Sequence, residues 1–263
     1  MLQSRACQQT ISGGVMRALK WRILSVLLLS MSFVITGCDA MKAKSSKGAG
    51  FVPLEEMSKR PDLPFHNVWV KAGVDWRNYS TLYIKDTNVR FLLEANWWQQ
   101  SIRKEKMTED AHEIGLYMHK QFEKAFIKDP YRRFRIISSP EAGSLTLEMA
   151  ITELVPSHQL LEALSIVAPY GSGVAVQAAA NASGAKCTVA FEAKIIDNSN
   201  GQIIAMIADR EQGKVAPVNL KALTVYGEAR TIIDEWADQF VQVANKRPNE
   251  IVKDTSSFTL TPW

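Results

Sequence analysis

Hydrophobic and polar residues alternate in several short stretches of the chain. In residues 145–152, Leu145, Leu147, Met149 and Ile151 share one side, whereas Thr146, Glu148 and Thr152 share the other. The same alternation occurs in residues 187–195, and a turn-rich cluster at 197–201 separates it from another apolar stretch at 203–210. Residues 79–84 and 134–137 are short stretches rich in β-forming residues. One-sided alternation predicts an antiparallel sheet with one buried face, and the turn cluster predicts a hairpin.

Two longer stretches have apolar residues at every third or fourth position, which is the period of an amphipathic helix. The first begins at Thr108, a suitable N-cap, and is ended by Asp129 and Pro130. The second runs from about 219 to 244 and is stopped by Pro248 and the two basic residues before it. The apolar positions are Ala111, Ile114, Met118, Phe122, Ala125 and Phe126 in the first, and Tyr226, Ala229, Ile233, Trp236, Phe240 and Val243 in the second.

These elements predict a single α+β domain over residues 67–246 with the order β-α-β-β-β-β-α. An antiparallel sheet of about five strands would carry two helices packed on one face. Residues 247–263 are polar until their end and are predicted to form a loose C-terminal tail.

The residues that precede this domain predict export across a membrane. Residues 16–22 carry three basic side chains, residues 23–34 are apolar and uncharged, and small residues close the segment. This order defines a secretory signal peptide over residues 1–37, and its apolar run is shorter than the roughly 20 residues of a spanning helix. Residues 1–15 do not fit the pattern, so translation is expected to begin at Met16. The alternative, a buried core helix at 23–34 with an ordinary Cys38, fits the order of features less well.

Residues 35–38, with the sequence ITGC, resemble the lipobox of bacterial lipoproteins. The resemblance implies cleavage between Gly37 and Cys38 and a diacylglyceryl thioether on Cys38, which would anchor the chain in a membrane. Asp39 resembles an enterobacterial signal for retention at the inner membrane, but this rule depends on the next residue and varies between bacteria. Inner and outer membrane therefore both remain open. Residues 38–66 are expected to form the lipidated end and a flexible tether.

Charge and cysteine content narrow the possible partners. Four of the 31 basic residues and none of the 27 acidic residues precede Cys38, so the mature part carries 27 of each. The net charge of +4 therefore belongs to the export segment and gives no reason to expect nucleic-acid binding. Cys7 would be lost with the leader, and the remaining Cys187 is expected to be a buried apolar side chain.

Four stretches carry a resemblance to a known family: VKAGVDWRNYSTLYI, SLTLEMAITEL, AKCTVAFEAKIIDNSNGQIIAMIADREQG and IDEWADQF. They look like an uncharacterised family of Gram-negative lipoproteins that is catalogued only as a domain of unknown function. The likeness runs from about residue 68 to residue 243 and rests on core and turn positions. The resemblance implies a location in the cell envelope and this fold, but no catalytic activity.

The sequence predicts neither a catalytic centre nor a metal or cofactor site. His112 and His119 are seven residues apart on one helix, which places the two rings about 10 Å apart and too far for one ion. A solvated helix face, on which Glu123 pairs with His119, is the favoured interpretation. The glycines at 171–173 have the spacing of neither a nucleophile elbow nor a dinucleotide loop.

Two segments are candidate interaction surfaces. Residues 160–182 are apolar and rich in small residues, and they are interpreted as an insertion over the sheet edge, an exposed patch for a partner or bilayer, or the lid of an apolar pocket. Trp97 and Trp98 precede a basic stretch. This pair suits either one ring in the core with the other at its rim, or a membrane interface. The possible surface residues are Trp97, Trp98, Tyr170, Val174 and Val176.

These observations favour a non-enzymatic lipoprotein of the cell envelope that faces the periplasm. Its domain would bind another envelope protein, the cell wall or the membrane surface. One alternative is a carrier or sensor of a small apolar molecule. A third hypothesis is a periplasmic hydrolase with catalytic residues around His112, His119 and His158.

Overall fold

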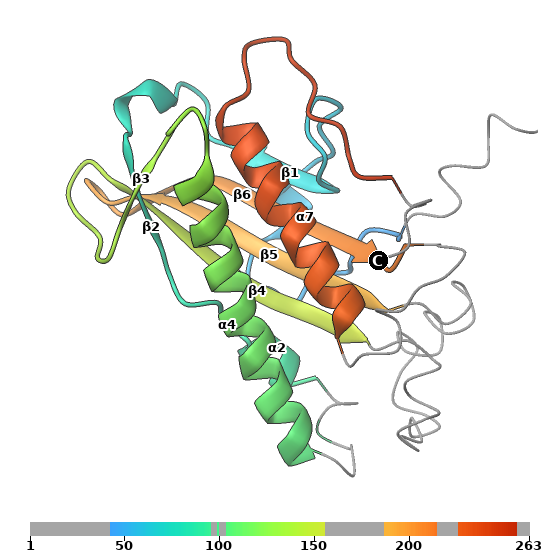
Figure 1. Cartoon of the computed structure of the whole chain (residues 1–263). Coiled ribbons are helices and arrows are strands. Elements are labelled where there is room, and N and C mark those ends of the chain that lie inside the picture. Colours follow the sequence, from blue (N-terminus) through green and yellow to red (C-terminus); the bar gives the residue numbers. More distant parts are fainter. Residues whose placement is uncertain (1–42, 96–98, 100–103, 156–186, 215–225, 257–263) are drawn as a thin grey trace, which may run out of the picture. The chain divides into compact units, whose positions relative to one another are not determined.

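The computed structural model describes residues 43–95, 99, 104–155, 187–214 and 226–256, all within one compact unit, Ala43–Trp263 (Figure 1). The predicted signal peptide, Gly37, Cys38 and Asp39 lie outside the described residues. In the described ranges, no helix has the length and hydropathy needed to span a bilayer.

The centre of the fold is a six-stranded sheet with the order β1-β6-β5-β4-β2-β3. Three long neighbouring strands, β4, β5 and β6, are antiparallel, and the β5–β6 turn contains Gly201 at a φ of 71°. Gly201 thus adopts a left-handed backbone that most other residues avoid. The strands are β1 (Asn67–Val70), β2 (Thr81–Ile84), β3 (Arg135–Ile137), β4 (Leu145–Val155), β5 (Thr188–Asp197) and β6 (Gln202–Gln212).

The α+β class is confirmed, whereas the prediction of an antiparallel sheet of about five strands is wrong in detail. Strand β2 pairs in parallel with both β3 and β4, so the sheet is mixed. Parallel neighbours need a long crossover connection, which here runs through the helices between β2 and β3. Strand β1, an edge strand of four residues that pairs with β6, was not predicted.

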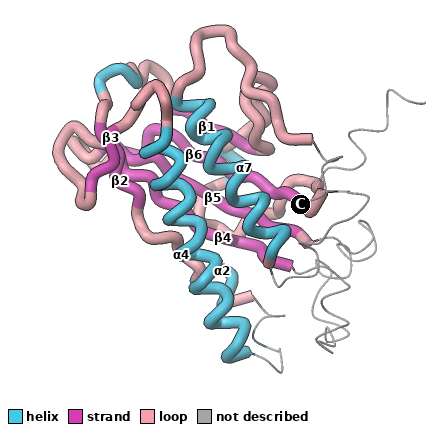
Figure 2. The backbone as a smooth tube through the Cα atoms, in the orientation of Figure 1, coloured by secondary structure: helices cyan, strands magenta, loops and turns pink. Residues whose placement is uncertain are grey.

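Two helices, α4 (Lys104–Lys128) and α7 (Gly227–Ala244), lie side by side across one face of the sheet (Figures 1 and 2). Helix α4 begins before the predicted N-cap at Thr108. The predicted apolar stripes face the sheet. The ring centroids of Trp236 on α7 and Phe191 on β5 are 4.5 Å apart, and those of Phe122 on α4 and Phe240 on α7 are 5.0 Å apart. A short helix, α2 (Arg90–Leu93), and two 3-10 turns, Leu54–Glu56 and Trp76–Asn78, complete the described elements.

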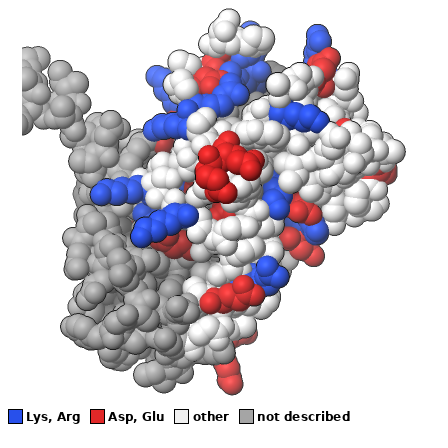
Figure 3. Space-filling view, turned by 180° about the vertical axis from the view of Figure 1, so that it is seen from behind, with Lys and Arg blue, Asp and Glu red and all other residues white. Residues whose placement is uncertain are grey.

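The opposite face of the sheet is partly covered, contrary to the expected solvated face. Thr146, Thr188 and Glu192 are buried there, and residues 43–57 cover Glu192 and part of β6. Val52 and its neighbours pack on β6, and the Glu192 carboxylate accepts the backbone N–H groups of Ala49 at 2.6 Å and Val52 at 2.7 Å. Basic and acidic side chains are interspersed over the described surface on this side (Figure 3).

Both ends of the domain differ from the predicted boundaries. Ala43 and Val52 are buried, so the described part of the expected tether over 38–66 belongs to the folded domain. In the predicted loose tail over 247–263, Val252 is buried and donates its N–H to the Asp62 carbonyl at 3.1 Å. Both segments contact residues far away in the sequence, which composition alone does not reveal.

Candidate functional site

A cavity of about 400 Å³ lies between the helix-covered face of the sheet and the C-terminal ends of α4 and α7. Its floor is formed by strand residues that include Leu82, Leu145, Leu147 and Ile207. The walls are mostly aromatic and aliphatic: Leu63, Phe65, Trp76, Phe126, Phe134, Phe240 and Val243. This volume and lining fall in the range of small-molecule sites, about 300–1,000 Å³.

The local sequence explains why space remains at this end of the core. Alternate residues of the strands point towards the helices, and Ala205 on β6 is the small member of that series. Ala244, the last residue of α7, lines the cavity from the opposite wall. Small side chains on two facing walls leave a volume that larger side chains would fill.

The rim of the cavity is basic. The lining residues include one carboxylate, that of Asp62. They also include five cationic side chains: Arg60, Arg77, Arg133, Lys246 and Arg247. Arg60 donates two hydrogen bonds to Asp62, at 3.0 and 2.9 Å, and the Lys246 Nζ lies 3.0 Å from the same carboxylate. The hydrogen bonds from Arg60 are the main cause that lowers the pKa of Asp62, so this carboxylate stays ionised.

Arg133 is held mainly by neutral groups. Its guanidinium donates to the backbone carbonyls of Tyr79, at 2.7 Å, and Trp76, and lies 4.3 Å from the ring centroid of Phe134. No ion pair joins this guanidinium to a carboxylate within the described part of the chain, because Asp129 accepts the backbone N–H of Arg133 instead. Burial lowers the pKa of Arg133, as expected for a cation removed from water.

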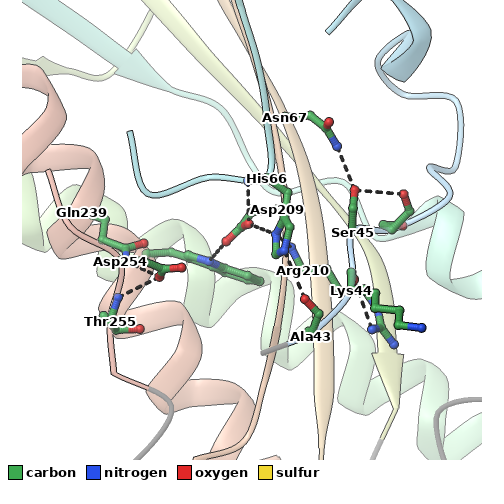
Figure 4. Close-up of polar contacts among 12 residues, drawn as sticks. Ala43, Lys44, Ser45, His66, Asn67, Asp209, Arg210, Gln239, Asp254 and Thr255 are labelled. Atoms are coloured by element: carbon green, nitrogen blue, oxygen red, sulfur yellow. Dashed lines mark hydrogen bonds and ion pairs between the residues drawn. The ribbon is translucent and has the colours of Figure 1, made fainter. Parts of the chain in front are cut away.

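A buried polar network holds the loop that forms one wall of the cavity (Figure 4). The Asp209 side chain, 1% exposed, accepts hydrogen bonds from Trp236 Nε1 at 2.8 Å and from the backbone N–H of His66 at 3.0 Å. The His66 Nδ1 lies 2.5 Å from Asp209, and its Nε2 lies 3.1 Å from the carbonyl of Ala43. Phe65, which lines the cavity, directly precedes this anchored histidine.

Both ring nitrogens of His66 contact oxygen atoms from distant parts of the chain. Nδ1 meets the Asp209 carboxylate, and Nε2 meets the Ala43 carbonyl. The Arg210 backbone N–H is 3.5 Å from Nδ1, which is too long to compete with the carboxylate contact. The contacts of His66 and Asp209 therefore tie α7, β6 and the segment at Ala43 together.

Sequence reasoning missed both the cavity and this network. His66 and Asp209 are 143 positions apart, and the cavity collects residues from 60 to 248. One available signal was Asp209 itself, a charged residue on the otherwise apolar side of residues 203–210.

Two of the three histidines of the hydrolase hypothesis, His112 and His119, lie on α4; the former is exposed, and the side chain of the latter is 16% exposed. The His112 Nδ1 is 2.7 Å from the Thr108 carbonyl, within the same helix. His119 lies 3.5 Å from Glu123, which confirms the predicted pairing, and 3.8 Å from Asp86. Among the described residues, no group of three or more His, Cys, Asp or Glu side chains could hold a metal ion.

The other candidates from the sequence can be placed only in part. Cys187 is buried as predicted and is a free thiol, and burial raises its pKa. The remaining candidates lie outside the described residues: Gly37, Cys38, Asp39, Trp97, Trp98, His158, Tyr170, Val174 and Val176. They stay predictions.

Comparison with known proteins identifies the family. The model of a family described as "Protein of unknown function (DUF3313)" matches residues 51–240. The chain belongs to this family. The match confirms the resemblance expected for residues 68–243, and the DUF3313 region includes His66, Asp209 and most of the cavity lining. No curated protein matches the chain.

Solved structures similar to this DUF3313 member include two PelC dodecamers from Paraburkholderia phytofirmans, one of them a point variant. The variant is 13% identical to this chain, with a TM-score of 0.33. The aligned region covers 65% of this chain and 94% of the PelC variant. The second is 11% identical with a TM-score of 0.34, and it covers 65% of this chain and 95% of its own. Likeness at this level carries no conclusion about assembly or ligands.

Proposed function

We propose that this protein is a non-enzymatic binding domain, tethered in the bacterial cell envelope and facing the periplasm, that holds a small apolar ligand. The observation that supports the proposal is the cavity of about 400 Å³ with its aliphatic and aromatic lining. The envelope address comes from the signal-peptide pattern and the lipobox-like residues 35–38. The alternative of a carrier or sensor thus gains a specific site, built from residues other than the expected lid at 160–182.

The expected affinity is modest. Each methylene transferred from water contributes about 0.8 kcal/mol, so eight buried methylenes contribute about 6 kcal/mol before the cost of lost motion. Such a ligand can bind and leave again without a change in fold, which suits a carrier or sensor.

The proposed tether is short. Four residues lie between Cys38 and Ala43, the first residue that the structure describes, and the five Cα–Cα steps that join them span at most about 18 Å. A lipid on Cys38 would therefore keep Ala43 close to the bilayer surface, where apolar ligands are concentrated.

A cavity-filling substitution tests the proposal. The probe is 1-aminoanthracene, a neutral dye that becomes fluorescent in an apolar site, titrated into the purified full chain free of detergent. Val243→Phe places a larger side chain in the cavity and should weaken binding by about tenfold or more, because filled space excludes the probe. Val241→Phe is the matched control, since Val241 lies on the same helix but does not line the cavity.

Two results would overturn the proposal. One is the absence of saturable fluorescence with the wild type. The other is equal binding by Val243→Phe and the wild type, provided that thermal melting shows both folded.

A surface for an envelope protein partner remains a second prediction. It was placed at Trp97, Trp98, Tyr170, Val174 and Val176, which lie outside the described residues. Photo-crosslinking from position 97 in living cells should trap a discrete partner, and recovery of background alone would count against that surface.

A further inference from the structure

We propose that the ligand of this cavity is a single-chain amphiphile with an anionic head group. Its hydrocarbon chain would fill the apolar interior, and its carboxylate or phosphate would lie at the basic rim beside Arg133. This inference rests on the proposed function, because it names the ligand class of the same cavity.

The balance of charge at the rim is the first support. Arg60 and Lys246 share the single carboxylate of Asp62, so this trio keeps a net positive charge. Arg77 lies at the exposed edge, where it pairs with Asp75. Neither the Arg247 nor the Arg133 guanidinium forms an ion pair within the described ranges, although Glu250 and Asp129 accept their backbone N–H groups; counting these two carboxylates with Asp62 and Asp75 still leaves five cations against four anions. The rim thus keeps an excess of positive charge after its internal pairs are counted.

Arg133 provides the second and stronger support. Lys246 and Arg247 follow the C-terminal end of α7, where cations also offset the helix dipole, so their position has another explanation. Arg133 lies in the connection to β3, and its guanidinium is hydrogen-bonded to neutral carbonyls and faces an aromatic ring, while the Asp129 carboxylate acts on it by charge without a direct ion pair. A half-buried guanidinium attracts an anion more strongly than an exposed one, because water screens it less.

The arrangement of polar and apolar groups selects an amphiphile over other anions. Phe134 follows Arg133 directly and lines the cavity, and Val243 and Ala244 come just before Lys246. The cations therefore adjoin the apolar walls. Inorganic phosphate would leave the interior empty, a neutral lipid would leave the cations without a partner, and a cationic detergent would be repelled.

Four ligands with the same chain but different head groups test this inference. Dodecanoate, dodecyl phosphate, 1-dodecanol and dodecyltrimethylammonium compete with 1-aminoanthracene for the full chain, each below its micellar concentration. The two anions should displace the probe at concentrations about tenfold lower than dodecanol, and the cation should be the weakest. The comparison of dodecanoate with dodecyl phosphate shows whether fatty acids or lipid phosphates are preferred.

Substitutions at the rim assign the preference to a residue. Arg133→Gln should reduce the advantage of dodecanoate over dodecanol to about twofold or less, and Arg133→Lys should keep part of it. Arg135→Gln is the control, because Arg135 is an exposed cation two positions away that does not line the cavity. Since Arg133 also binds two carbonyls, Arg247→Gln provides a second variant, in which the advantage should fall without loss of folding.

The possible failures can be told apart. If all four ligands compete equally in the wild type, or if the advantage survives in both Arg133→Gln and Arg247→Gln, the head-group inference is overturned while the apolar site stands. If neither the probe nor any ligand binds the wild type, the proposed function itself fails.

Discussion

The pair formed by His66 and Asp209 should be a main stabilising contact of the domain. Removing the imidazole by His66→Ala leaves the Asp209 carboxylate, which is 1% exposed, without its contact to Nδ1. The carboxylate keeps two donors, Trp236 Nε1 and the backbone N–H of residue 66. The same substitution also removes the contact between Nε2 and the Ala43 carbonyl.

The magnitude follows from these contacts. The substitution removes one hydrogen bond to the carboxylate, which contributes about 1.5–3 kcal/mol, and the contact with the Ala43 carbonyl, which contributes about 1 kcal/mol. The carboxylate keeps two other donors, so a total near 3 kcal/mol is appropriate. We expect His66→Ala to lower the free energy of unfolding by about 3 kcal/mol, a large part of the stability of a typical domain.

A double-mutant cycle isolates the pair itself. In an Asp209→Ala background, His66→Ala should cost only about 1 kcal/mol, because the contact with Ala43 is all that remains, which gives a coupling energy of about 2 kcal/mol. Urea unfolding of the four full-chain variants measures it. The control is His112→Ala, an exposed histidine whose ring contacts only its own helix, with an expected change within about 0.5 kcal/mol. A coupling energy below about 0.5 kcal/mol would refute the assigned contact between the imidazole and the carboxylate.

Three further predictions concern other parts of the chain. The pKa of Tyr117 is raised from 10.0 to about 12 by burial and by its hydrogen bond to Asp234. The stabilisation that the protonated phenol provides is therefore complete below pH 10.0 and is lost as the pH rises towards 12. Tyr117→Phe should remove this alkaline loss of stability in urea titrations. Glu192→Gln should weaken the hold on residues 43–57 and speed their proteolysis by about tenfold, whereas Glu148→Gln, at an exposed pair, should not. Labelled palmitate should be incorporated into the wild type but not into Cys38→Ser, and equal labelling would remove the predicted anchor.

The sequence predicted those elements whose pattern is local. Alternation at residues 145–152 and the turn at 197–201 correspond to β4 and to the β5–β6 hairpin, because each repeats within a few residues. The stripe that includes Phe122 faces the core as expected. These features need no knowledge of distant partners.

Features that depend on distant contacts were missed. The parallel pairing of β2 depends on where the chain returns after α4, and β1 is defined mainly by its pairing with β6. Residues 43–57 resemble a linker in composition, yet the buried Glu192, 140 positions after Val52, holds them on the sheet. The cavity is a consequence of all these placements, so no local pattern could have indicated it.

The central claim is that an amphiphile occupies the cavity, and its position can be measured directly. In the full chain with labelled methyl groups, nuclear Overhauser contacts should join the chain protons of dodecanoate to the methyl groups of Leu147 and Ile207, which line the cavity. Contacts only with the exposed side chains of Leu116 and Ile127, or no contacts at saturating dodecanoate, would contradict the account.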